Sequence, residues 1–155
     1  MVGQSEFFMD LQRCTTGERA ALRRNCGKLL KDADGQAVLL FYRYVPRSIP
    51  AWQEDYWFAA ACFSCLWEAD ISSVPMQQAL AQLKQTSDSM EHRLAGLLDQ
   101  RWESDGFLLG KLSRIIKLAK AKGIAIDCAQ LLEDLVYWNS STQSVQRKWA
   151  KAMYE

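Results

Sequence analysis

Apolar residues recur along this chain at the three- and four-residue spacing of one helix face, and this periodicity restricts the fold more than any other feature. It is clearest in three sets near the end of the chain: Leu108, Leu112, Ile115, Ile116 and Ala119; Cys128, Leu131, Leu132, Leu135 and Trp138; Val145, Trp149, Ala152 and Met153. With only 8 Gly and 3 Pro, the chain lacks the frequent turns of a sandwich or barrel. The pattern predicts an all-α fold, a compact bundle of about eight to nine helices with no sheet.

Capping residues and helix breakers set the limits of the predicted helices. Four pairs place a capping side chain three residues before an acid or amide: Thr15 with Glu18, Asp88 with Glu91, Asp127 with Gln130, and Ser140 with Gln143. Before the three sets above, helices are predicted over 5–13, 16–26, 36–45, 50–68, 75–85 and 88–102. The weakest joints are Asp70–Val74 and Ser104–Gly106. The 155 residues suit a single all-helical domain, 1–155, with possible halves 1–86 and 87–155.

The apolar stretches are too short for a membrane protein. The longest, Trp57–Trp67, is about half of what a bilayer span needs, and the first residues lack the basic and apolar regions of a secretory signal. We therefore expect a cytoplasmic protein that does not engage membranes. The odd number of cysteines, five, in apolar surroundings favours reduced, buried thiols over a disulfide framework.

Positive charge is concentrated in separate stretches although the net charge is only +1. Arg13–Lys31 holds six basic residues and one acid, and Gly106–Ile126 holds five basic residues and no acid. Between them, Ser48–Asp105 carries nine acids and three basic residues. The field near each stretch, rather than the total, governs binding to a polyanion, so the chain is predicted to bind nucleic acid. A solvated lysine-rich face remains the alternative.

The segment from Leu108 to Lys120 combines an apolar face with a cationic one. Lys111, Arg114, Lys117 and Lys120 cover the face opposite the apolar residues, without the acids that normally stabilise a solvated helix. Phosphates would relieve the resulting repulsion. No zinc-finger spacing or aromatic RNA-binding motif accompanies these cations, so binding without sequence specificity is predicted. Arg19, one turn before Arg23, is a further candidate for contact with phosphates.

Enzymatic and metal sites are not indicated by the remaining motifs. Cys62 and Cys65 have no second cysteine pair or nearby histidine, so we expect core thiols, no metal and no cofactor. His92, the single histidine, lies between charged neighbours, as in a partly exposed helix. The adjacent acids Glu133 and Asp134 point in different directions on a helix, so we expect salt bridges to a basic helix and no shared site. Most tryptophans are expected in the core, whereas Trp52 and Trp102 could anchor a protein partner.

Five motifs cover most of the chain: Gly17–Arg24, Arg93-Leu94 with Leu97-Leu98, Leu112–Leu118, Ile126-Asp127 with Leu131–Leu135 and Trp138, and Arg147–Ala150 with Tyr154. Together, in this order and spacing, they resemble the CasB small-subunit family of the type I-E CRISPR Cascade complex. Cys128 stands where the family often has an aromatic residue, and Asp70–Met76 lacks the expected glycine-containing turn. The match is weakest in the middle of the chain.

This resemblance implies a non-catalytic, all-helical subunit of a crRNA-guided complex. Its implied partners are crRNA, target DNA including the displaced strand, the backbone and large subunits, and a second copy of itself. Matched to the family motifs, the predicted nucleic-acid contacts are Arg23, Arg24, Arg93, Arg114, Lys117, Arg147 and Lys148. Lys111, Lys120 and Lys151 join them on helix geometry, and Arg19 on its spacing from Arg23. The alternative is a helical adaptor whose basic faces bind acidic proteins.

Overall fold

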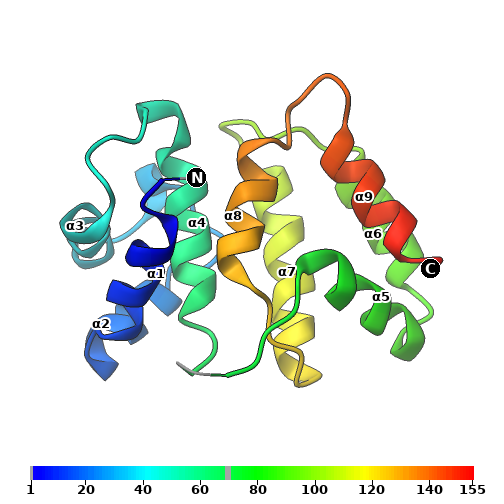
Figure 1. The fold of residues 1–155 in the computed structure, drawn as a ribbon, viewed down its shortest axis with the longest axis horizontal. Coiled ribbons are helices and arrows are strands. Elements are labelled where there is room, and N and C mark those ends of the chain that lie inside the picture. The colour runs from blue at the N-terminus through cyan, green and yellow to red at the C-terminus, as the bar shows by residue number, and fades with distance from the viewer. Residues whose placement is uncertain (1, 69–70) are drawn as a thin grey trace.

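The computed structural model describes residues 2–68 and 71–155, and every regular element in them is helical (Figure 1). One isolated backbone bridge joins Val74 to Ile126, and the described residues form no strand. The all-α prediction is confirmed. The elements are α1 (Gln4–Gln12), α2 (Thr16–Arg23), η1 (Leu30–Asp32), α3 (Gly35–Tyr44), η2 (Ala51–Gln53), α4 (Glu54–Ser64), α5 (Met76–Thr86), α6 (Met90–Leu98), α7 (Phe107–Ala121), α8 (Cys128–Val136) and α9 (Ser144–Ala152).

Two of the four predicted helix caps form as expected. Thr15 makes a full capping box before α2: its hydroxyl accepts from the Glu18 backbone N–H at 3.1 Å, and the Glu18 carboxylate accepts from the Thr15 N–H at 2.9 Å. At α8, the Asp127 carboxylate accepts from the Gln130 N–H at 3.1 Å. Asp34, which the sequence analysis did not single out, caps α3 in the same way. These caps satisfy backbone donors that the first helical turn leaves free.

The other two predicted caps are wrong. The helix expected after Asp88 begins at Met90 with no side-chain cap. Ser140 bonds the Thr142 hydroxyl at 3.1 Å instead of a helix terminus, and α9 begins only after Gln143, whose φ of 52° is left-handed. Side-chain hydrogen bonding within a turn therefore competes with capping at these serine- and threonine-rich sequences.

The middle of the chain differs from the predicted boundaries. The helix expected over 50–68 is split: Pro50 precedes the short 3-10 turn η2, and α4 ends at Ser64. The helix expected over 88–102 ends at Leu98. Of the predicted joint Asp70–Val74, Asp70 lies outside the described residues. The joint at 104–106 is confirmed, because Gly106 takes a φ of 74° immediately before α7.

The helices form two groups that meet in the middle of the molecule. In the first, α3 contacts α1 and α2, and both α1 and α2 contact α4; in the second, α5 contacts α6 and α9, and α6 contacts α7. The groups join where α4 packs against α8 (Figure 1). The division into possible halves 1–86 and 87–155 stays a prediction.

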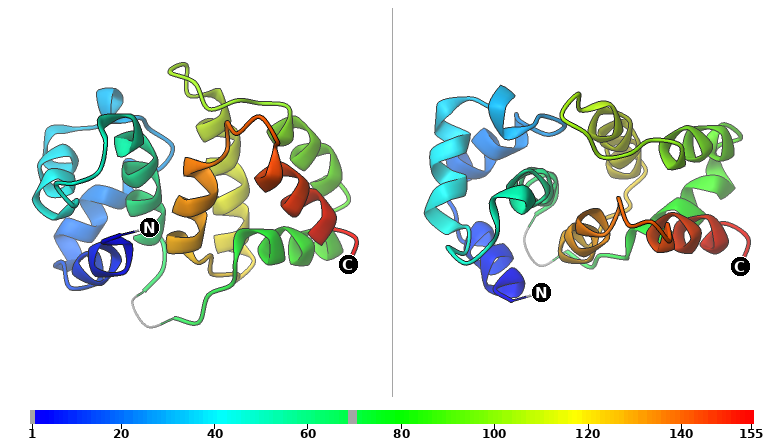
Figure 2. Two further views of the ribbon diagram at one scale, coloured as in Figure 1. Left: turned by 45° about the horizontal axis from the view of Figure 1, so that its top comes forward. Right: turned by 90° about the horizontal axis from the view of Figure 1, so that it is seen from above.

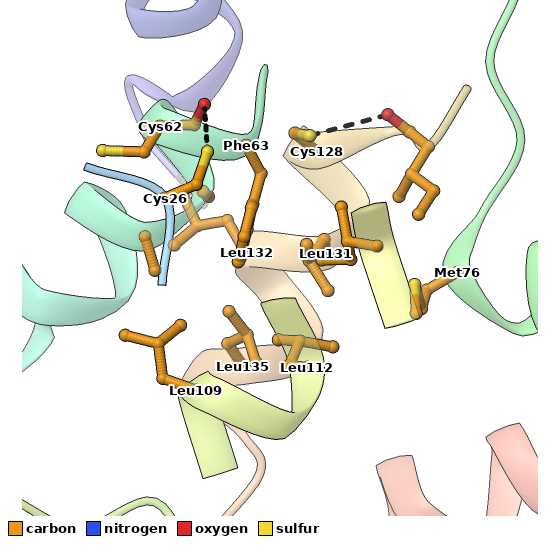
Figure 3. Packing of buried hydrophobic residues seen from close by; sticks show 14 of the residues in the cluster. Cys26, Cys62, Phe63, Met76, Leu109, Leu112, Cys128, Leu131, Leu132 and Leu135 are labelled. Atoms are coloured by element: carbon orange, nitrogen blue, oxygen red, sulfur yellow. Dashed lines mark hydrogen bonds between the residues drawn. The ribbon is translucent and has the colours of Figure 1, made fainter. Parts of the chain in front are cut away.

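The core is built mainly from aromatic and aliphatic side chains at this junction. Figure 3 shows Phe63 of α4 together with Leu132 of α8 and Leu112 of α7, all of which are buried. Trp57, Trp67, Trp138 and Trp149 are buried as predicted, at 6% exposure or less. Burying large apolar side chains removes much apolar surface from water, which is the main source of folding free energy.

The cysteines are reduced thiols, as predicted. Four of the five cysteines are buried, Cys14 is half-buried, and all five are free. Burial raises the pKa of the Cys26 thiol to about 12, and that thiol donates to the Cys62 carbonyl oxygen at 3.2 Å (Figure 3). The thiols therefore stay protonated and act as small apolar groups. Separately, none of the helices described here is both long and apolar enough to cross a membrane.

Candidate nucleic-acid interface

Helix α7 has the predicted cationic face, and its apolar face is buried. Leu112, Ile116 and Ala119 are at most 1% exposed, whereas Arg114, Lys117 and Lys120 are exposed. Across residues 2–68 and 71–155, none of the basic side chains of α7 forms an ion pair. Lys120 lies in the last turn, where the helix dipole favours a cation. The positive charge of this face is therefore available to a ligand.

A hollow of about 320 Å³ lies between α6 and α7. Its lining consists of His92, Arg93, Gly96, Lys111, Arg114 and Ile115. The Lys111 ammonium reaches over α6 and lies 3.6 Å from the place where a Cβ on Gly96 would be. Residues that are far apart in the sequence, Arg93 and Arg114, thus line the same concave surface.

The end of α2 adjoins the other side of α7. Gly27, with a φ of 88°, lies so close to α7 that an added Cβ would be 2.9 Å from the Ser113 hydroxyl. Burial dominates the pKa of the Cys26 thiol, and the charges of Lys117 and Arg23 lower it. The exposed Arg23 makes one bond within the protein, from its guanidinium to the Cys65 carbonyl oxygen at 3.3 Å. Figure 2 shows α7 and α6 along one side of the molecule. We call this surface the α2–α7–α6 face and define it by its exposed or half-exposed cations, Arg23, Lys28, Arg93, Lys111, Arg114 and Lys117. Arg24 is also exposed, and its charge helps the Asn25 amide to lower the pKa of Asp34 at the start of α3.

Arg19 does not belong to this face, although the sequence analysis included it. Its guanidinium donates to three backbone carbonyl oxygens, those of Leu11 at 3.0 Å, Ser64 at 3.3 Å and Trp67 at 2.7 Å. These bonds tie α2 to the ends of α1 and α4. Because its donors are used inside the protein, we assign Arg19 a structural role.

Lys148, although partly exposed, is held by an ion pair to a buried carboxylate. Its ammonium lies 2.6 Å from Asp134 on α8, and the Asp134 side chain is only 4% exposed. The same carboxylate accepts from the Trp149 indole N–H at 3.0 Å and from the Gln130 amide at 3.3 Å. The predicted salt bridge to a basic helix is confirmed for Asp134, where it joins α9 to α8, whereas Glu133 is exposed and forms no ion pair among the described residues.

Arg147 and Lys151 line a different hollow. It measures about 390 Å³, lies between α5 and α9, and includes Gln77 and Ser144 in its lining. The two hollows share no residue. Viewed from above, α9 lies in one layer with α8, and α6 lies in the other with α7 (Figure 2). The basic stretches therefore gather as two surfaces, because α2 and α7 adjoin while α9 is on the opposite layer.

Two features of the α2–α7–α6 face were missed by sequence reasoning. Lys28 was counted in the basic stretch but not selected, and only its position one residue after Gly27 brings it near α7. Gly96 gave no sequence signal, yet the Lys111 ammonium packs over it, at ordinary contact distance from the place of a Cβ. His92 is exposed, as expected, and its place in the hollow could not be read from its charged neighbours.

Comparison with known proteins places this architecture in a family. The family model for CRISPR-associated protein Cse2 matches residues 18–154, nearly the whole chain. The chain belongs to the Cse2 family. This membership confirms the resemblance to the CasB small subunit of type I-E Cascade that the sequence motifs carry. A search of curated proteins found no significant match.

Solved structures share the Cse2 fold. A Cse2-family CRISPR-associated protein from Thermus thermophilus is 25% identical, with a TM-score of 0.79 over 99% of this chain and 97% of that one. CasB from M. ruber is 23% identical, with a TM-score of 0.72 over 98% of this chain and 92% of the other. A chain of a CRISPR RNA-guided surveillance complex is 22% identical, with a TM-score of 0.78 over 97% and 91%.

Proposed function

We propose that this Cse2 protein is the small subunit of a CRISPR RNA-guided surveillance complex and that it holds DNA on its α2–α7–α6 face without reading the sequence. The Cse2 family is non-catalytic. The observation that carries the proposal is the set of cations on α7, which has no acid within the helix and no ion pair among the described residues. Uncompensated cations on an exposed surface bind phosphates and release their counterions.

The task of such a complex explains why the surface has no base-reading motif. Pairing of a guide RNA with its target strand replaces one duplex by another of similar stability, so protein contacts to the displaced strand shift the balance. Those contacts must tolerate every target sequence, and cations that contact only phosphates do so. We include crRNA, target DNA, the backbone and large subunits, and a second Cse2 copy among the proposed partners.

A second surface suits contact with neighbouring protein subunits. Trp52 is 62% exposed, and its ring lies 6.2 Å from that of Tyr56, which in turn lies 4.5 Å from Trp102. Exposed tryptophan is enriched at the energetic centres of protein interfaces. We therefore assign Trp52 to the proposed subunit contacts, whereas Trp102 is half-buried against Tyr56 and links the two helix groups.

The decisive experiment measures affinity for single- and double-stranded DNA as a function of salt. In the double variant Arg114→Glu/Lys117→Glu, we expect affinity to fall about tenfold or more and the log–log salt slope to become shallower by about 1 to 2, because two phosphate contacts are lost. Both side chains are exposed, so circular dichroism should stay native.

The matched control is Arg13→Glu/Arg47→Glu, which changes the net charge by the same amount at two exposed positions outside the α2–α7–α6 face. This variant should keep most of the affinity, since the local field rather than the total charge governs binding. A salt slope near zero for the wild-type protein would instead support the alternative, an adaptor that binds acidic proteins. Equal losses in the two double variants would exclude α7 as the binding surface.

A further inference from the structure

The hollow between α6 and α7 holds more positive charge than one backbone phosphate neutralises. Its lining includes the cations of Arg93, Lys111 and Arg114 together with the imidazole of His92, and no carboxylate. Among the described residues, these three cations form no ion pair. A phosphodiester in a nucleic-acid backbone carries a single negative charge, so one such group would leave most of this charge uncompensated.

The hollow between α5 and α9 shows how this protein otherwise arranges clustered cations. There, Lys148 is paired with the buried carboxylate of Asp134, and Glu155 is part of the lining. Comparable internal compensation is missing between α6 and α7, where cations from two helices converge on one space. Holding like charges together costs free energy unless an anion binds between them.

The shape of the α6–α7 hollow suits a compact anion. Its volume of about 320 Å³ is in the range of small-molecule sites. The Lys111 ammonium lies over Gly96 of α6, 3.6 Å from the place of a Cβ there, and the buried side chain of Ile115 forms one wall. Guanidinium, ammonium and imidazole groups together supply many N–H donors. A phosphate monoester offers three acceptor oxygens and a charge close to −2 at neutral pH.

We propose that this hollow binds a phosphate monoester, either the terminal phosphate of a nucleic-acid strand or that of a free nucleotide. The inference rests on the proposed function in one respect, since a strand end reaches the hollow along the α2–α7–α6 face. It adds a preference that binding to the phosphate backbone alone would not produce: the same oligonucleotide is bound more tightly when its end carries a phosphate.

The test compares two single-stranded oligonucleotides of identical sequence, one with a 5′-phosphate and one with a 5′-hydroxyl, by fluorescence anisotropy at fixed ionic strength. We expect the phosphorylated strand to bind about tenfold more tightly, from the charge-assisted hydrogen bonds to the extra oxygens. In Arg93→Gln/Lys111→Met this advantage should disappear. The matched control, Lys117→Met/Lys120→Met, removes two cations of the same helix outside the hollow and should weaken both strands while keeping their ratio.

Competition with adenosine monophosphate identifies the source of the phosphate. Displacement of the phosphorylated strand by millimolar nucleotide supports a free-nucleotide site, and resistance to it, with the tenfold advantage present, supports a strand-end site. Equal affinity for the two strands, or an advantage that survives in Arg93→Gln/Lys111→Met, would overturn the proposal. Because binding of the 5′-hydroxyl strand and its salt slope are measured in the same series, failure of this inference is distinguishable from failure of the proposed function.

Discussion

Replacing Asp134 by alanine tests the buried network that attaches α9 to α8. The Asp134 carboxylate, 4% exposed, accepts from Lys148 at 2.6 Å, Trp149 at 3.0 Å and Gln130 at 3.3 Å. In Asp134→Ala the buried Trp149 indole N–H keeps no acceptor, which costs about 1–3 kcal/mol, and the half-buried Gln130 amide adds about 1 kcal/mol. Lys148, 38% exposed, can turn to water and contributes little.

The expected loss is therefore about 3 kcal/mol in the free energy of unfolding, or about 6–12 °C in Tm for a domain of this size. The assay is urea and thermal denaturation followed by circular dichroism. Glu133→Ala is the matched control, because it removes the adjacent carboxylate, which is exposed. That variant should change stability by less than about 0.5 kcal/mol.

Lys148→Met completes the test, since Lys148 was predicted from the sequence to contact nucleic acid. If its main role is to neutralise Asp134, the variant should lose about 1–3 kcal/mol of stability and keep DNA affinity within about twofold. Two results would refute this reasoning: an Asp134→Ala variant as stable as Glu133→Ala, or a Lys148→Met variant that loses as much DNA affinity as Arg114→Glu/Lys117→Glu.

Two further predictions concern stability. Gly110 lies inside α7, and an added Cβ there would meet no heavy atom within 4 Å. Gly110→Ala should therefore raise the free energy of unfolding by about 0.5–1 kcal/mol, measured by urea denaturation. A decrease would contradict this prediction. The pKa of Glu18 is lowered by the Thr15 backbone N–H and that of Asp34 by the Asn25 amide. Both carboxylates therefore stabilise the fold above the ordinary carboxyl pKa of about 4 and lose that contribution as pH falls toward their folded values. The urea midpoint should drop on acidification, and by less in Glu18→Gln/Asp34→Asn.

The parts of the fold that depend on local sequence were predicted well. The apolar spacing in α7 and α8 located both helices, because a helix that buries one face must repeat its apolar residues every three to four positions. Prediction was less successful where two local interactions compete. Ser140 was expected to cap a helix and instead bonds Thr142, and both arrangements suit a serine in a turn.

For the candidate interface, the sequence identified the kind of residue but not its use. Arg19 and Arg114 look equivalent in the sequence, yet Arg19 donates to three backbone carbonyls and Arg114 lines an open hollow. Lys148 and Arg147 also look alike in the sequence, although only Lys148 contacts a buried carboxylate. These differences depend on which groups from distant helices face each side chain, and a charge pattern along the chain contains no such information.

By itself, the sequence determined that the chain is helical, that its family is Cse2, and that α7 has a cationic face, because periodicity, motif order and charge are properties of neighbouring residues. Only the tertiary structure decided that α2 and α6 extend this face while α9 lies on the other layer. Electrostatic binding depends on distance in space, and that distance is set by how α4 packs on α8 and how the remaining helices pack around them.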